Sequence, residues 1–211
     1  MAPPPPDTPA APAAPFDGQE FGARIRALRM ERGLSLRKVA GLLGISPSAL
    51  SQIERGKMRP SVTRLYAIMS ALDAPVTAAF SDDHPGSASA PAAAAPPGDD
   101  GVVVARSGEA ATLTLGHGVR YRRLTPVATP GVNLFESTYP PGACSSQNAE
   151  FVAHNGREIG NVVSGALTVD VGFDSYELGP GDSIAFSSGT PHRITNNGTV
   201  PAVAIWMNLA G

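Results

Sequence analysis

The stretch SLRKVAGLLGISPSALSQIERGKMRPS, residues 35–61, carries two short helical patterns separated by a turn at Gly44. Ser35 and Ser46 each stand just before an apolar run, where a hydroxyl caps a helix N-terminus, and Pro47 follows at a first helical position. The apolar residues of the first pattern are Leu36, Val39 and Leu43. The stretch therefore predicts a helix, a tight turn and a second helix.

The second helix has two unlike faces on a wheel of ~100° per residue. The apolar side holds Ala49, Leu50, Ile53 and, among them, Glu54. The other side holds Ser48, Ser51, Gln52 and Arg55. A helix that follows another across a turn and turns small polar groups outward can enter a DNA major groove. An ordinary solvated helix in a bundle has the same composition, so the pattern alone leaves both interpretations open.

The flanking sequence extends the helical region and is basic. Further stripes at helical spacing are Phe21, Ile25, Leu28 and Leu65, Ile68, Met69, Leu72. We expect four or five short helices in a domain of residues 17–80. Between Gly18 and Phe80 there are ten Lys and Arg against four Asp and Glu, whereas the remainder from Ser81 has six against twelve. A basic first half and an acidic second half predict a polyanionic partner for the first half only.

Two segments lack residues that could form a core. Residues 1–16 and 81–100 consist mainly of Pro, Ala, Gly, Ser and Asp, a composition that cannot offset the entropy of ordering. We expect a disordered tail and a disordered linker between two domains. With neither a long apolar run nor a secretion signal, we predict no membrane partner and a cytoplasmic location.

After Asp100 the hydrophobic period changes from 3.6 to two. Leu167, Val169 and Val171 alternate with polar residues, and Val203, Ile205 and Met207 alternate with Ala204 and Trp206. Frequent turn clusters such as ELGPGD and NNGTVP separate these runs. The region 101–211 is therefore predicted to be an antiparallel sandwich or barrel.

The first region resembles the helix-turn-helix domain of the XRE (Cro/C1-like) repressor family over about 60 residues, through L-S-x-x-x-V-A, S-x-x-x-L-S-x-I-E-x-G and the following P-S. The resemblance implies that the second helix meets DNA bases through Pro47, Ser48, Ser51 and Gln52. It also implies that Arg29 neutralises Glu54. We assign to phosphates, which position a protein without reading sequence, the cations Arg37, Lys38, Arg55, Lys57 and Arg59.

The second region resembles a cupin β-barrel, a double-stranded β-helix or jelly roll, over residues 131–209. The segment GDSIAFSSGTPHRITN, residues 181–196, matches the second cupin motif, and HNGREIGNVVSG, residues 154–165, matches most of the first. The resemblance implies that His154, Glu158, His192 and Asn196 point into a ligand pocket. A further motif-one histidine is replaced by Val152.

Three of these residues suit a metal. His154, Glu158 and His192 could hold Zn, Mn, Fe or Ni with open coordination positions. The same three side chains could instead hydrogen-bond a polar ligand directly. The sequence leaves both open.

The domain order is similar to that of XRE-family regulators with a cupin sensor, among them the putrescine-utilisation repressor group. It implies a repressor whose affinity for a double-stranded DNA operator depends on a small-molecule effector in the barrel. Because one short recognition helix per chain contacts too few bases to be selective, we expect a homodimer on an inverted repeat. Two alternatives remain: a metal-dependent cupin enzyme of dioxygenase or isomerase type fused to a DNA-binding module, and a barrel that only dimerises the protein. Because Val152 removes a ligand, we expect a sensor and no enzyme. The sequence identifies neither effector nor operator.

Overall fold

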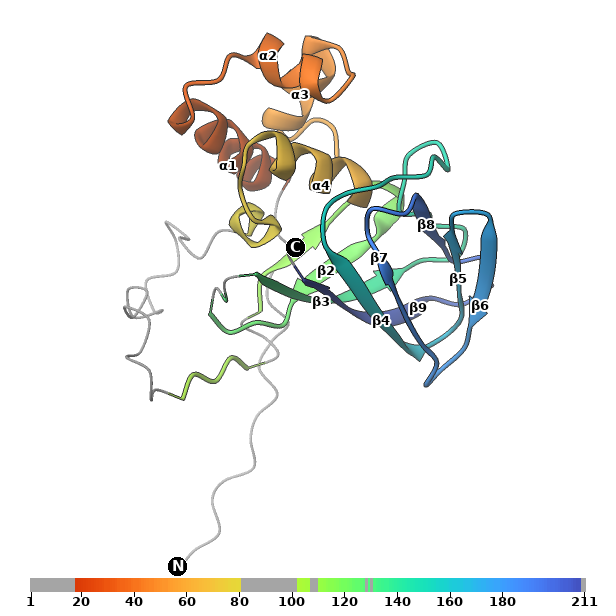
Figure 1. Ribbon diagram of the computed structural model, residues 1–211. Helices are drawn as coiled ribbons and strands as arrows, with labels where there is room; N and C mark the ends of the chain where they lie inside the picture. The colour runs from red at the N-terminus through yellow and green to blue at the C-terminus, as the bar shows by residue number, and fades with distance from the viewer. Residues whose placement is uncertain (1–17, 81–101, 107–109, 128, 130, 210–211) are drawn as a thin grey trace, which may run out of the picture.

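The computed structural model describes residues 18–80, 102–106, 110–127, 129 and 131–209 (Figure 1). The predicted tail, 1–16, and linker, 81–100, lie outside the described residues. In the part of the chain that is described, every helix is too short or too polar to cross a bilayer.

The N-terminal region is a small helical domain. Its elements are α1 (Gly18–Glu31), α2 (Leu36–Leu42), α3 (Pro47–Glu54), α4 (Val62–Ala71) and the 3₁₀ helix η1 (Val76–Ala79). The hydroxyls of Ser35, Ser46 and Ser61 accept hydrogen bonds from Lys38, Ala49 and Arg64 backbone N–H groups, as the capping pattern predicts. A Cβ on Gly22 would lie 2.5 Å from the Ile53 carbonyl oxygen, so this glycine lets α1 pack directly against α3.

The C-terminal region is an antiparallel barrel of two sheets. One sheet has the order β1-β2-β3-β9-β4-β7 and the other β6-β5-β8. The strands are β1 (Thr112–Thr114), β2 (Arg120–Arg123), β3 (Val132–Tyr139), β4 (Arg157–Ser164), β5 (Leu167–Val171), β6 (Asp174–Leu178), β7 (Ser183–Ser187), β8 (His192–Thr195) and β9 (Ala202–Leu209), with the short 3₁₀ helix η2 (Gly116–Gly118) after β1. The change of period after Asp100 is thus confirmed as a change from helices to strands.

Alternate residues of β9 face the barrel interior. Ala202, Ala204, Trp206 and Asn208 are buried, whereas Val203, Ile205 and Met207 are half-exposed on the outer surface. Gly160, opposite Trp206 on β4, makes room for the indole, because a Cβ there would lie 2.4 Å from the ring. The barrel interior is therefore wide enough to hold Trp206 and a pocket beside it.

The helical domain packs directly on the barrel. Helix α4 lies between the other helices and the strands (Figure 1), and the Thr63 N–H donates to the Ser145 carbonyl at 3.1 Å. Phe80 stacks on Phe135 of β3 with ring centroids 5.3 Å apart. The two regions share one hydrophobic cluster. The sequence predicted two domains joined by a linker and gave no sign of this contact between them.

Candidate functional site

Helix α3 presents a polar face to solvent. Its apolar side is packed through Leu50 and Ile53, which are buried. Pro47 and Ser48 are exposed, and Ser51 and Gln52 are half-exposed. The four residues expected to meet bases therefore lie on the accessible side of one helix, where hydroxyl and amide groups can reach base edges.

The cations assigned to phosphates lie on α2 and at or after the C-terminal end of α3. Arg37, Lys38, Arg55, Lys57 and Arg59 are all exposed, and none of them forms a salt bridge with a residue that the structure describes. Such uncommitted charges are available to a nucleic-acid backbone.

The structure confirms the buried pair of Arg29 and Glu54. Arg29 Nε donates to Glu54 Oε1 at 2.6 Å, and a terminal guanidinium nitrogen donates to Oε2 at 2.9 Å. The side chains are only 12% and 4% exposed. A further donation to the Leu34 carbonyl ties this pair to the segment before α2. The hydrogen bond to Glu54 raises the pKa of Arg29 against the opposing effect of burial.

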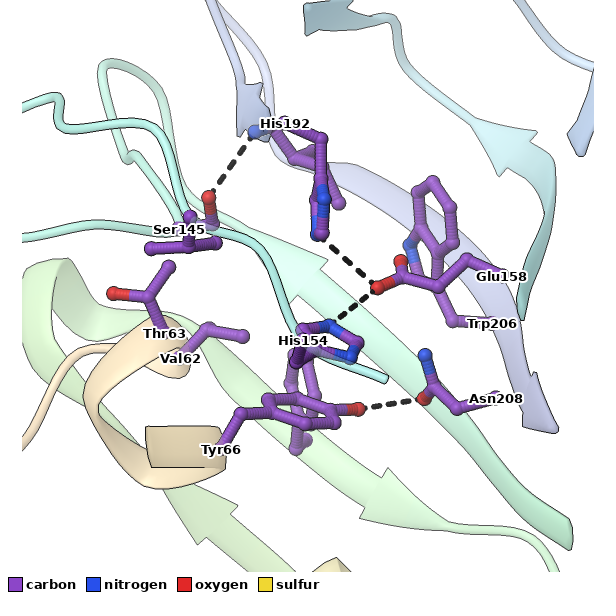
Figure 2. A pocket seen from close by; sticks show the side chains of 12 residues that line it. Val62, Thr63, Tyr66, Ser145, His154, Glu158, His192, Trp206 and Asn208 are labelled. Atoms are coloured by element: carbon purple, nitrogen blue, oxygen red, sulfur yellow. Dashed lines mark hydrogen bonds and ion pairs between the residues drawn. The ribbon is translucent and has the colours of Figure 1, made fainter. Parts of the chain in front are cut away.

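Three predicted pocket residues converge inside the barrel (Figure 2). His154 Nε2 and His192 Nε2 lie 2.9 and 3.2 Å from Glu158 Oε1. The exposed fractions of His154, Glu158 and His192 side chains are 17%, 6% and 5%. His154 shortly precedes β4, Glu158 lies on β4 and His192 begins β8, so two segments that are distant in the chain form the cluster.

The tautomers of the two imidazoles follow from their other contacts. His154 Nδ1 lies 3.1 Å from the Asn155 carbonyl oxygen, and His192 Nδ1 lies 2.9 Å from the Thr190 carbonyl oxygen. A carbonyl only accepts, so each Nδ1 carries a hydrogen. Each Nε2 then faces a carboxylate oxygen, which also only accepts. These facing acceptor atoms therefore require a proton shared between the carboxylate oxygen and Nε2, or a cation.

The pKa values agree with this charge requirement. Burial alone would raise the pKa of Glu158, but hydrogen bonds from His154 and His192 and their charge lower it from 4.5 to about 2. Burial likewise lowers the pKa of His192, but its hydrogen bond to Glu158 and the carboxylate charge outweigh burial and raise it. The carboxylate is therefore ionised and attracts cations.

Comparisons with known proteins identify both regions. Residues 25–78 match the helix-turn-helix family model, and residues 135–208 match the cupin domain model. The chain combines a helix-turn-helix domain with a cupin domain. It is 27% identical to the HTH-type transcriptional regulator PuuR of Escherichia coli K12 over 183 residues, which are 85% of this chain and 89% of PuuR.

Two further relatives match one or both domains. The HTH-type transcriptional regulator DdrOP3 of Deinococcus deserti is 47% identical over 47 residues, 22% of this chain and 36% of that protein. The crystal structure of an HTH_3 family transcriptional regulator from Vibrio cholerae covers 92% of this chain and 97% of its own, with a TM-score of 0.63 and 24% identity. The solved structure supports the two-domain fold.

The cupin cluster is chemically suited to a metal ion. Its donor atoms, one from each of His154, Glu158 and His192, lie within 4.8 Å of one another. The Nδ1 hydrogen bonds to carbonyls fix both rings with Nε2 toward the centre, the usual outer support of a ligating histidine. Val152 also lines the pocket, and its backbone exchanges hydrogen bonds with His192. These three side chains can bind a divalent metal, and Val152 adds no fourth donor.

Asn196 lies apart from this cluster. Its amide donates to the Tyr139 and Val200 carbonyls, and its Oδ1 accepts from the Gly198 N–H. The side chain is thus fully used in closing the turn before β9, and Asn196 is not among the residues that line the pocket.

Several residues that line the pocket were not predicted from the sequence, among them Trp206, Asn208 and Tyr66. Trp206 and Asn208 of β9 face inward, and Asn208 lies directly opposite Glu158 in the β4–β9 register. Tyr66 comes from α4 of the other domain. The alternation of β9 indicates which residues share a face, but not which face points into the barrel. The position of Tyr66 in the pocket depends on how the two domains pack.

Proposed function

We propose that the protein is a transcriptional regulator, and specifically a repressor. It binds DNA through α3 and responds to a small molecule in the cupin barrel. The observation that carries the proposal is the exposed polar face of α3, held on a helix-turn-helix whose buried side is fixed by the Arg29–Glu54 pair. The likeness to PuuR over most of both chains supports it.

The test of DNA reading is selection of binding sites from random DNA, followed by footprinting. We expect two half-sites in an inverted repeat with centres ~34 Å apart or a multiple of that distance. Protection of a single half-site by one copy would contradict the dimeric mode of binding.

We propose that the dimer forms through the outer face of the large sheet. One short recognition helix contacts too few bases to select a site, so two copies are needed. Ile159 of β4 pairs with Met207 of β9, which also pairs with Leu134 of β3, and Ile159 is 36% exposed. An apolar surface across adjacent strands suits a second copy of the chain.

Light scattering tests this interface. Ile159→Lys should yield monomers, while Val200→Lys, at an exposed apolar residue in the turn before β9, should leave the dimer intact. Dimers in both variants would place the interface elsewhere.

We propose further that a divalent ion, Zn, Mn, Fe or Ni, is held by His154, Glu158 and His192. Such an ion would satisfy the charge requirement of the three facing acceptors and would supply a Lewis-acidic position for an oxygen of the effector. Elemental analysis of the purified protein tests this, with Glu158→Gln as the variant that should lose the ion.

One observation favours a second function, a metal-dependent cupin enzyme. Two histidines and one carboxylate form the donor set of non-haem iron oxygenases. An enzyme would also need room for its substrate and a proton-transfer group in reach, and the cavity beside the cluster is only about 20 Å³. Iron bound at one ion per chain together with turnover of a metabolite would support the enzyme over the sensor.

A further inference from the structure

Helix α4 of the helix-turn-helix domain forms the roof of the barrel pocket. Val62, Thr63 and Tyr66 line the cavity together with barrel residues (Figure 2). Val62 and Tyr66 are one helical turn apart and so share a face, while Leu65, Ile68 and Met69 of α4 are buried in the helical domain's own core. The helix therefore belongs to both domains at once.

Tyr66 contacts both sides of the histidine–glutamate cluster. Its ring stacks on the His154 imidazole with centroids 4.8 Å apart and planes 12° from parallel. Its hydroxyl donates a 2.6 Å hydrogen bond to Asn208 Oδ1, and Asn208 lies opposite Glu158 on the neighbouring strand. One side chain of the DNA-binding domain thus touches a cluster histidine and the neighbour of the cluster carboxylate.

The closed pocket has no room for an organic molecule. Its cavity of about 20 Å³ is near the ~10–15 Å³ that a single water needs. A metal ion fits among donors that already converge, but a metabolite does not. Trp206 Nε1, a buried donor that has no partner among the described residues, faces this space, so a larger occupant with an oxygen acceptor would find a hydrogen bond there.

A direct contact connects α4 to the turn before the DNA-reading helix. Arg64, on α4, donates a 2.8 Å hydrogen bond to the carbonyl of Leu43. Leu43 is the C-cap of α2 and lies in the turn that leads into α3. Because α4 also shares the buried core of its domain, we expect a displaced α4 to carry α2 and α3 with it.

We propose that α4 is a movable roof over the pocket. Tyr66 acts as its latch, because its hydrogen bond to Asn208 holds α4 against the barrel. A small organic effector that carries a carboxylate or hydroxyl oxygen enters only when Tyr66 releases Asn208, and the departing helix moves α3 relative to the barrel. This rests on the proposed sensor function, and it adds pocket residues on the DNA-binding domain and the route from pocket to DNA.

The latch can be tested without knowing the effector. Spin labels at Glu31→Cys, at the end of α1, and Asp174→Cys, on β6, report the distance between the domains in the full chain; both sites are exposed. Cys144, the single native cysteine, is replaced by Ser, and labelled protein is diluted with unlabelled protein so that only distances within one chain contribute. Acrylamide quenching of Trp206, the only tryptophan, reports solvent access to the pocket.

Tyr66→Phe removes only the hydrogen bond to Asn208, and Tyr66→Ala removes the stacking as well. Both should add a second, longer distance and increase quenching, more strongly for Ala. Tyr176→Phe, at an exposed tyrosine on β6, is the matched control and should match the wild type. If Tyr66→Ala does not fold, the Phe variant decides.

Unchanged distances in the folded Tyr66 variants would overturn the proposed role of Tyr66, even if quenching rises. Quenching alone would show only that solvent enters through the space left by the smaller side chain. The proposed function is tested separately, by DNA selection and by the ion content of Glu158→Gln. If the protein fails to bind DNA but the Tyr66→Phe distances change, the result would contradict the proposed regulator function and still support the movement of α4.

Discussion

Glu54 of the helical domain and Glu158 of the barrel are both buried, but their partners differ. Glu54 is held by a guanidinium that is charged at every accessible pH and is fixed by two hydrogen bonds. Glu158 is held by two imidazoles, and a metal ion can replace an imidazole proton beside the carboxylate. The first pair is permanently neutralised and structural. The second can exchange its counter-charge, and this property suits a binding site.

The largest expected loss of stability is at Arg29. Arg29→Ala leaves Glu54 buried and unpaired, so we expect the free energy of unfolding to fall by ~3 to 5 kcal/mol. Denaturant unfolding measures this. Arg29→Met combined with Glu54→Leu should recover much of the loss, because it removes both charges. A single variant with a wild-type midpoint would show that the pair contributes nothing.

Glu158→Gln should affect binding rather than folding. The amide removes the charge that attracts a cation but leaves two imidazoles that can be neutral, so we expect loss of Zn²⁺ binding and a smaller fall in stability than in Arg29→Ala. Calorimetric titration with Zn²⁺ and denaturant unfolding provide the two values. Glu136→Gln, which breaks the half-exposed pair with Arg122, is the control and should bind Zn²⁺ normally. Equal Zn²⁺ affinity in both variants would contradict the assigned site.

The DNA-binding face should divide into residues that specify and residues that attract. Gln52→Ala should reduce discrimination between selected and random DNA by ~1 to 3 kcal/mol, while Lys57→Ala should weaken all sequences alike and lower the salt slope by ~1. Fluorescence anisotropy over a range of salt concentrations measures both. Equal effects of the two changes on both DNAs would mean that the reading face lies elsewhere.

Val152→His should add a further donor to the cluster of His154, Glu158 and His192. Val152 lines the pocket beside His192, so an imidazole there should tighten Zn²⁺ binding by about tenfold, or about 1.4 kcal/mol. Competition with a chelator of known affinity measures the change. Unchanged affinity would place the metal away from position 152.

Local signals in the sequence predicted much of this structure. Ser35, Ser46 and Ser61 cap their helices as expected, since capping depends on residues three positions apart. His154, Glu158 and His192 converge as the motif resemblance implies. These predictions depend on short-range spacing or on a fold whose strand order brings motifs together.

What the sequence did not predict depends on contacts between distant segments. Tyr66 and Asn208 are separated by 142 positions, and no periodicity in either element indicates that they meet. Asn196 was expected in the pocket, but its amide closes a turn. Val203, Ile205 and Met207 alternate with buried residues, yet they lie outward because Trp206 and two alanines fill the interior. Facing and domain packing are tertiary properties that alternation alone does not fix.

We expect the barrel pocket to sense a ligand and to change DNA affinity without converting that ligand. The most direct measurement is the affinity for the selected operator across a set of amino acids, polyamines and organic acids, for the wild type and Glu158→Gln, with each compound quantified before and after incubation. We expect at least one compound to shift the wild-type affinity, to leave the affinity of the variant unchanged and to be recovered intact. Consumption of that compound by the wild type, or an equal shift in Glu158→Gln, would contradict it.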